Sequence, residues 1–325
     1  MIDLVKSILK KMLKMILPDD NYIRLLHSWR GWNDSEMDIT FEQVLSQNSP
    51  RRLKLKFAVK FPEDNATDEA SKHYINKYSW FAENNRLGHE PELTNLLSLI
   101  LRDNLVFYDV GANAGFCSAY ACRVPGYSGQ VHAFEPLPAM ADMVNAFKSG
   151  HQGETSLTVH QVALGETRGR MTIHWDTDYG LASLALDRGE NSAVVEVETI
   201  DAIGVPPPDF LKVDAEGYEY NVFRGAEKLL KTAPPFIFFE STCEDRKSTE
   251  SLLPFDYLAS FGYEFFLPAW EQPNGTYHVG IGPDFSFEMP VLIPFEIRER
   301  LTFPGEAINV VAAPRDFDWT PCLKA

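Results

Sequence analysis

The sequence predicts an α/β protein with a Rossmann-like, doubly wound sheet, and three features of the chain lead to this prediction. Apolar segments rich in β-branched and aromatic residues alternate with helical segments, as expected for a parallel sheet between two layers of helices. A strand, a glycine turn and a helix follow one another at 105–123, which is the opening of a nucleotide-binding βαβ unit. Several predicted strands also end in a carboxylate, at the edge of the sheet where ligands bind.

The length and composition indicate a globular protein with one large domain and an appendage, or with two domains. The chain has 325 residues, of which 45% are hydrophobic and 23% are charged. We expect a basic amphipathic helix at 1–17, a mixed, mainly helical extension at 18–100 and the main domain at 101–325. The net charge of −16 argues against a general nucleic-acid binder. The four cysteines show no zinc-site spacing, and so few cysteines in a long chain favour a reducing, cytoplasmic location.

The expected helix at 1–17 carries lysines on one arc and apolar residues on the other. Its apolar run is broken by lysines and too short to cross a bilayer, and it lacks the uninterrupted apolar region of a signal peptide. Such a helix packs on its own domain or on a second subunit, or it binds a partner or an anionic membrane surface. We favour packing on the protein itself, and a homo-oligomer or a peripheral position at the inner face of the membrane stays open.

The turn DVGANAG at 109–115 indicates which ligand the first strand serves. Gly111 and Gly115 allow the backbone to turn sharply and to approach a ligand closely. Asn113 stands where a dinucleotide fingerprint has a bare glycine for the pyrophosphate. Asp109, at the strand end, would repel a phosphate and attract an ammonium group. S-adenosylmethionine carries an ammonium and a sulfonium and no phosphate, so the turn favours this cofactor over a dinucleotide.

The next two strands complete the expected cofactor site. The strand at 130–134 ends in Glu135, whose carboxylate suits the two hydroxyls of a ribose. The segment 157–164 is predicted as the third strand, and Ala163 near its end is expected beside the adenine.

The remaining elements are predicted from their apolar patterns. A helix at 93–101 is expected to cover the cofactor pocket. The others are an antiparallel insertion at 171–175 and 194–200, a strand at 210–214, a helix reaching Leu230, a strand at 236–239, a helix at 252–261 and strands at 263–267 and 308–312. Residues 268–306 are rich in proline, glycine and aromatic residues without periodicity, and we expect a loop that binds the substrate.

Four of the predicted parallel strands end in an acid: Asp109, Glu135, Asp214 and Glu240. Acids gathered at one edge repel each other unless they face cations or hydrogen-bond donors, and the cofactor accounts for the first two. Asp214 and Glu240, together with Glu216, would lie where an acceptor binds. There they would take a proton from a hydroxyl, or hold a divalent cation such as Mg²⁺ that polarises it.

Two further residues near these acids have other expected roles. Glu219 is expected to stabilise the first turn of the following helix. Lys212, one position inside its strand, either lines the site with its stem or is solvated.

Together these motifs resemble the FkbM-type S-adenosylmethionine-dependent methyltransferases. The matching stretches are DVGANAG (109–115), FEP (134–136), VALG (162–165), GLAS (180–183), LKVDAEGYE (211–219) with RGA (224–226), and FE (239–240). The resemblance covers about residues 90–267 and the final strand. It implies a class I methyltransferase fold of about seven strands with the last antiparallel, and methyl transfer to a hydroxyl of a sugar, glycan or related natural product. It assigns cofactor contacts to Asp109, Gly111, Asn113, Gly115 and Glu135, and it places Asp214 and Glu216 near the acceptor.

Two other functions stay open in the sequence. A nicotinamide-dependent oxidoreductase would share the fold, but Asn113 and Asp109 disfavour a diphosphate at the turn. A non-catalytic, membrane-docked adaptor would keep the fold without the reaction, but the intact acidic strand ends argue against it. We therefore expect an O-methyltransferase that acts on a small-molecule or glycan acceptor.

Overall fold

The computed structural model describes residues 53–54, 90–124, 126–151, 153–175, 182–185, 191–243, 249–271, 277–279, 289–302 and 307–319. The helix expected at 1–17 lies outside these residues, as does most of the extension at 18–100, so both stay predictions. Within the described ranges, no helix is both long and apolar enough to cross a membrane.

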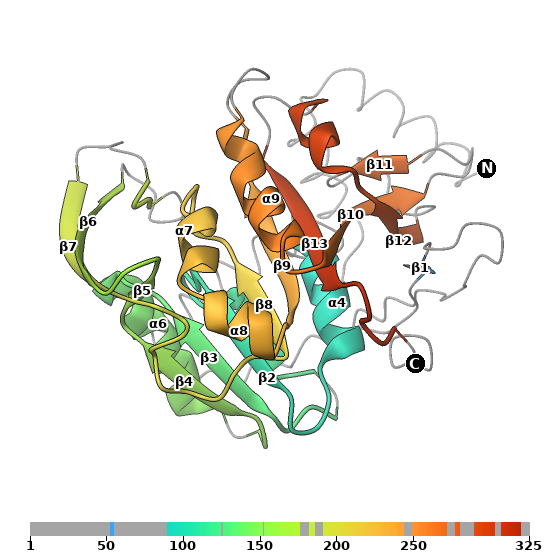
Figure 1. Ribbon diagram of the computed structural model, residues 1–325. Helices are drawn as coiled ribbons and strands as arrows, with labels where there is room; N and C mark the ends of the chain where they lie inside the picture. The colour runs from blue at the N-terminus through green and yellow to red at the C-terminus, as the bar shows by residue number, and fades with distance from the viewer. Residues whose placement is uncertain are drawn as a thin grey trace, which may run out of the picture.

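One large sheet forms the centre of the molecule (Figure 1). Its core strands, in order across the sheet, are β4 (Ser156–His160), β3 (Gln130–Phe134), β2 (Val106–Val110), β8 (Phe210–Val213), β9 (Phe236–Ser241), β13 (Ile308–Pro314) and β10 (Tyr263–Glu271). The first five pair in parallel, and β13 runs antiparallel to both of its neighbours. This order confirms the predicted doubly wound sheet with an antiparallel last strand.

Helices cover both faces of this sheet, which explains why its central strands are buried throughout. All five residues of β2 and all four of β8 are buried. One hydrophobic cluster joins one face of the sheet to α4 (Pro91–Ile100), α5 (Phe116–Ala121) and α6 (Pro138–Gly150). A second cluster joins the other face to α7 (Glu219–Arg224), α8 (Glu227–Thr232) and α9 (Leu253–Ala259), which follows the short 3₁₀ helix η2 (Glu250–Leu252).

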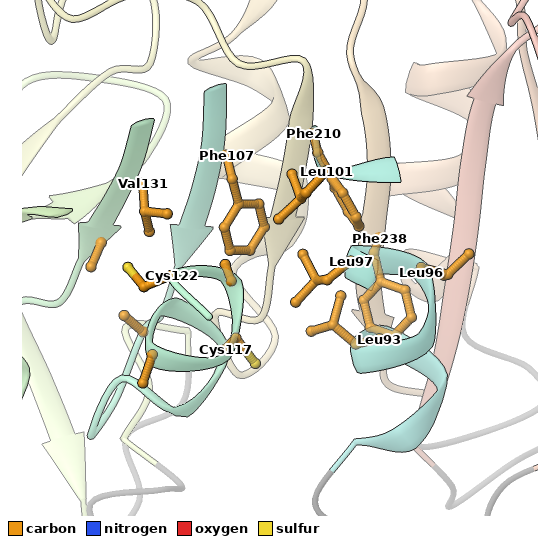
Figure 2. Packing of buried hydrophobic residues seen from close by; sticks show 14 of the residues in the cluster. Leu93, Leu96, Leu97, Leu101, Phe107, Cys117, Cys122, Val131, Phe210 and Phe238 are labelled. Atoms are coloured by element: carbon orange, nitrogen blue, oxygen red, sulfur yellow. The ribbon is translucent and has the colours of Figure 1, made fainter. Parts of the chain in front are cut away.

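Helix α4 packs its leucines on the aromatic residues of the sheet. Figure 2 shows Leu93 and Leu97 facing Phe107, Phe210 and Phe238, which come from three neighbouring strands. The rings of Phe107 and Phe210 meet edge to face, with 5.3 Å between their centroids. The apolar side of α4 is therefore buried against this face of the sheet.

The segment predicted as one strand at 157–164 forms two strands in different sheets. β4 ends at His160, where a tight turn brings the amide of Val162 to the carbonyl of His160. The chain then enters a separate three-stranded sheet as β5 (Ala163–Leu164). There β5 pairs with β7 (Asn191–Glu198), which pairs antiparallel with β6 (Gly169–Trp175), as the predicted insertion requires.

Part of the segment 268–306, expected to be a loop, extends the central sheet instead. β10 continues to Glu271, β12 (Met289–Pro294) pairs antiparallel with it, and the 3₁₀ helix η4 (Ile297–Thr302) follows. β11 (Tyr277–Val279) also pairs with β10, and β1 (Leu53–Lys54) pairs with β12. These strands were not predicted because prolines interrupt their residue pattern. Proline is tolerated in strands mainly toward the edge of a sheet.

Candidate functional site

A pocket opens where β2, β3 and β8 end. It is lined by Val110, Gly111, Asn113, Phe134, Glu135, Pro136, Ala163, Leu164, Ile173, Ala182, Leu184, Asp214, Ala215, Glu216 and Tyr218. Helix α4 contributes none of these lining residues, so the expectation that it covers the pocket is wrong: its leucines are held against the sheet.

The glycine turn is packed directly against the end of β8. Gly111 has φ 69°, and a β-carbon there would lie 1.7 Å from the carbonyl oxygen of Asp214. Gly115 has φ 83° and begins α5. Asn113 also has a positive φ, 50°, and its Oδ1 accepts a hydrogen bond from the amide of Ala114. These conformations explain why the turn uses two glycines and an asparagine.

Glu135 holds the glycine turn while it faces the pocket. Its Oε2 accepts a hydrogen bond from the amide of Asn113 and its Oε1 one from the amide of Leu137, both at 2.8 Å. Burial raises the pKa of Glu135 to about 7, against the opposing effect of these backbone donors. Each carboxylate oxygen has a second lone pair, so Glu135 can still accept hydrogen bonds from a ligand.

Asp109 lies beneath the pocket rather than in it. Its side chain has no exposed surface, and its Oδ2 accepts hydrogen bonds from the amide and the hydroxyl of Ser118 at the start of α5. Its Oδ1 lies 3.3 Å from Nζ of Lys212, an ion pair without hydrogen-bond geometry. The predicted contact of Asp109 with a cofactor ammonium is therefore not supported by this arrangement, because the carboxylate is occupied inside the fold.

Lys212 is the residue whose place the sequence left undecided. It is 3% exposed, and its ammonium donates a hydrogen bond to the carbonyl oxygen of Gly111 at 2.9 Å. It also lies 3.3 Å from Oδ2 of Asp214, as it does from Asp109. Burial alone would lower the pKa of Lys212, but the two carboxylates outweigh burial and keep its pKa well above the usual value.

A signal for this placement was present in the sequence. Lys212 is the one charged residue inside an otherwise apolar strand, 210–213. In the parallel pairing of β2 with β8 it is the register partner of Asp109. A lysine in such a strand is buried only when acids surround it.

The turn after β8 is fixed by buried polar side chains on two sides. Glu216 has φ 51°, a conformation uncommon for a residue with a side chain. Oε1 of Glu219 accepts hydrogen bonds from the amides of Ala215 and Gly217, at 2.9 and 3.1 Å. The hydroxyl of Ser183 donates to the carbonyl of Glu216 at 2.6 Å. Glu219 thus has a structural role, as expected, but these hydrogen bonds hold the turn before α7 and not the first turn of the helix.

The three acids predicted to act on the acceptor lie together. Asp214, Glu216 and Glu240 each offer an oxygen within 4.8 Å of the others, and all three are half-buried. Burial raises the pKa of Glu240 to about 8, helped by Asp214 and Glu216. Such a cluster contains groups able to accept a proton near neutral pH, and its oxygen ligands are of the kind that Mg²⁺ prefers.

The pocket brings most of the predicted site residues together. Those that line it are Gly111, Asn113, Glu135, Ala163, Asp214 and Glu216. Glu240 joins through the acid cluster, whereas Asp109 and Gly115 are not lining residues. Sequence reasoning missed the wall formed by Ile173, Ala182 and Leu184, because these residues come from the separate small sheet and the segment beside it.

Comparison with known proteins matches the core domain to one family model. Residues 109–265 match the family model of the methyltransferase FkbM domain. A search of curated proteins finds no significant match.

Solved structures with a similar arrangement include three proteins. A methyltransferase FkbM from Methylobacillus flagellatus KT has 19% identity and a TM-score of 0.41, and the similarity covers 70% of this chain and 55% of that one. A precorrin-6y C5,15-methyltransferase from Geobacter metallireducens GS-15 has 14% identity and a TM-score of 0.36, over 70% and 88% of the two chains. Cofactor-bound Rv0187 from MTB has 14% identity and a TM-score of 0.38, over 78% and 94%. The chain thus spans little more than half of the Methylobacillus protein.

Proposed function

We propose that this chain, whose residues 109–265 form an FkbM-family methyltransferase domain, transfers the methyl group of S-adenosylmethionine to a hydroxyl oxygen of a sugar, a glycan or a related natural product. The observation that carries this proposal is the shared pocket. The glycine turn and Glu135 line one part of it, and Asp214 and Glu216 line another.

The residues around the turn fit S-adenosylmethionine. Glu135 faces the pocket with free lone pairs, which suits the two hydroxyls of a ribose. Gly111 lines the pocket, and the amino-acid part of the cofactor would lie beside its backbone. Asn113 fills the position where a diphosphate needs a bare glycine. Ala163, Ile173 and Leu184 offer an apolar wall for the adenine. When bound, the cofactor supplies an electrophilic methyl group on a positively charged sulfur.

The acid cluster would prepare the acceptor. As the acceptor oxygen forms its bond to the methyl carbon, the bond from that carbon to sulfur breaks, and the hydroxyl proton passes to a carboxylate. Glu240 is the best candidate for that proton, because burial and the neighbouring acids raise its pKa to about 8, which makes its ionised form a stronger base than an ordinary carboxylate. The negative charges of Asp214 and Glu216 would help to keep Glu240 basic. The chain otherwise accelerates the reaction by alignment.

A divalent cation is a second way in which the same acids would serve the acceptor. Three carboxylate oxygens within 4.8 Å of one another match the ligands of Mg²⁺. Lys212 already pairs with Oδ2 of Asp214, so this carboxylate would offer the metal its other oxygen. A cation held here would lower the pKa of the acceptor hydroxyl.

Cofactor binding is the first test, because it needs no acceptor. Isothermal titration calorimetry with S-adenosylmethionine and with NAD should give binding of the first only. Glu135→Ala should weaken that binding at least about tenfold, equivalent to ~1.4 kcal/mol. Glu227→Ala, which removes an exposed glutamate on α8, is the control and should bind as the wild type does. Binding of NAD in place of S-adenosylmethionine would overturn the proposal in favour of an oxidoreductase.

The acceptor is then sought by mass spectrometry. Candidate glycans and lipid-linked sugars are incubated with the protein and the cofactor, with and without Mg²⁺, and a mass gain of one methyl is recorded. Glu240→Gln should slow the transfer while leaving cofactor affinity unchanged. Transfer that Mg²⁺ and chelators leave unaffected would exclude the metal.

A further inference from the structure

Lys212 occupies a place that joins the two halves of the pocket. Its ammonium lies between the ends of β2 and β8, within 3.3 Å of Asp109 below the glycine turn and of Asp214 at the acid cluster. It also donates to the carbonyl of Gly111, inside the turn itself. Gly111 and Asp214 both line the pocket, whereas the lysine lies behind them.

The charges around Lys212 show what its ammonium balances. The carboxylates that face it are Asp109 on β2, Asp214 after β8, Glu90 before α4 and Glu135 after β3. The thiol of Cys117 on α5 also faces it, but burial raises the pKa of this thiol well above its usual value, so it stays neutral. Asp109 has no exposed surface, so it cannot be neutralised by water or by salt ions. Without the ammonium, Asp109 and Asp214 would repel each other across neighbouring strands.

Repulsion between Asp109 and Asp214 would disturb the glycine turn, because the backbones of the turn and of the Asp214 segment are in direct contact. The amide of Asp214 donates to the carbonyl of Val110, and Gly111 has no room for a β-carbon against the Asp214 carbonyl. A shift of either strand end would therefore move the other. The carbonyl of Gly111 would at the same time lose the donor provided by Lys212.

We propose that Lys212 is a positioning residue for methyl transfer: its ammonium holds the cofactor-binding turn and the Asp214 carboxylate at a fixed separation. This inference rests on the proposed function, since it assigns the turn to S-adenosylmethionine. Lys212 itself touches neither cofactor nor acceptor. Its removal should weaken binding of S-adenosylmethionine and of the product S-adenosylhomocysteine to the same extent, because both use the turn.

Chemical rescue provides a test that separates this role from mere stability. Lys212→Ala keeps the β-carbon and removes three carbons and the ammonium group, which together correspond to propylammonium. Titration calorimetry should show affinity for S-adenosylmethionine reduced at least tenfold and largely restored by millimolar propylammonium, but not by propanol of the same size. The matched control is Val213→Ala, which removes a buried side chain from the opposite face of the same strand. At equal loss of stability it should keep its affinity within twofold and ignore propylammonium.

The outcomes distinguish the two proposals. If wild-type protein does not bind S-adenosylmethionine, the proposed function fails and this inference fails with it. If the wild type binds and folded Lys212→Ala binds within twofold of it, only the role of Lys212 is overturned. Equal rescue by propanol and propylammonium also overturns it.

Should Lys212→Ala not fold, Lys212→Met is compared with Lys212→Met/Asp109→Asn. Neutralising Asp109 should then recover at least threefold in affinity, and no recovery contradicts the proposal.

Discussion

Gly111 and Asp214 approach so closely that a β-carbon on Gly111 would lie 1.7 Å from the carbonyl oxygen of Asp214. The glycine turn and the acid turn are therefore in direct backbone contact, although about a hundred residues separate them in the chain.

Gly111→Ala should accordingly destabilise the protein strongly. The new methyl group forces β2 and β8 apart and also meets an unfavourable φ of 69°. We expect a loss of about 3 kcal/mol or more in the free energy of unfolding by urea, and loss of cofactor binding. Gly126→Ala is the matched control, because Gly126 has φ 77° and no atom within 4 Å of the β-carbon position. It should cost only about 1 kcal/mol. Equal losses in the two variants would contradict the close packing.

The stability of the fold should decrease from mildly acidic to mildly basic pH. Burial raises the pKa of Glu240 from 4.5 to about 8, and that of Glu135 and Glu219 to about 7. The native state therefore binds more protons than the unfolded state between these values. The stability that these protons provide is fully present below pH 4.5 and is lost as pH rises toward 8. Glu240→Gln should reduce this fall, by an amount on the order of a few kcal/mol at most.

Urea unfolding of the wild type and of Glu240→Gln at a series of pH values measures this effect. The midpoints of the two proteins should diverge as pH rises, with the variant becoming relatively more stable. Parallel curves would mean that Glu240 titrates alike in the folded and unfolded chains.

Ser183→Ala should loosen the contact between the pocket wall and the acid turn. The Ser183 side chain is buried, and its loss leaves the carbonyl of Glu216 without this donor. We expect a cost of about 1–3 kcal/mol in unfolding free energy, together with weaker cofactor binding. Ser149→Ala removes a similar hydroxyl that donates to the Asn145 carbonyl at the surface, and it should cost less than about 0.5 kcal/mol. A difference smaller than experimental error would argue against the contact.

Arg300→Met should disturb the acceptor side of the pocket through β9. Arg300 is fully buried, and its guanidinium donates to both the hydroxyl and the carbonyl of Ser241, which follows Glu240. The loss should be about 3 kcal/mol, measured by urea unfolding. Arg102→Met, which removes an exposed arginine that also donates to two carbonyls, is the control and should cost less than about 1 kcal/mol. Similar values for both would show that burial of Arg300 adds nothing.

The central sheet was predictable because its strands carry their own signals. The strand at 130–134 was predicted with its observed bounds, and the acids that follow the strands led to the pocket. The helix expected to reach Leu230 is interrupted at Gly225, where a β-carbon would lie 2.0 Å from the carbonyl of Gly165. That break depends on a neighbour 60 residues away, which no local pattern contains.

The roles of charged residues were harder to predict than their positions. Asp109 and Lys212 were both singled out, but whether each faces the pocket or the interior depends on the pairing of β2 with β8. The wall containing Ile173 depends likewise on how a separate small sheet is placed beside the main one. The apolar pattern identifies strands, and the three-dimensional register decides which acid meets which base.

The place of β13 between β9 and β10 has a consequence for how the chain reaches its native state. β9 and β10 do not pair with each other directly, because β13 lies between them. β13 comes about 40 residues after β10 in the sequence, so this part of the sheet forms only once β13 has been inserted. Until it inserts, β9 and β10 present bare edges to other chains. Pairings of such long sequence separation form slowly. During refolding from denaturant, this half of the molecule is thus where aggregation would start, and dilute protein should give the better yield.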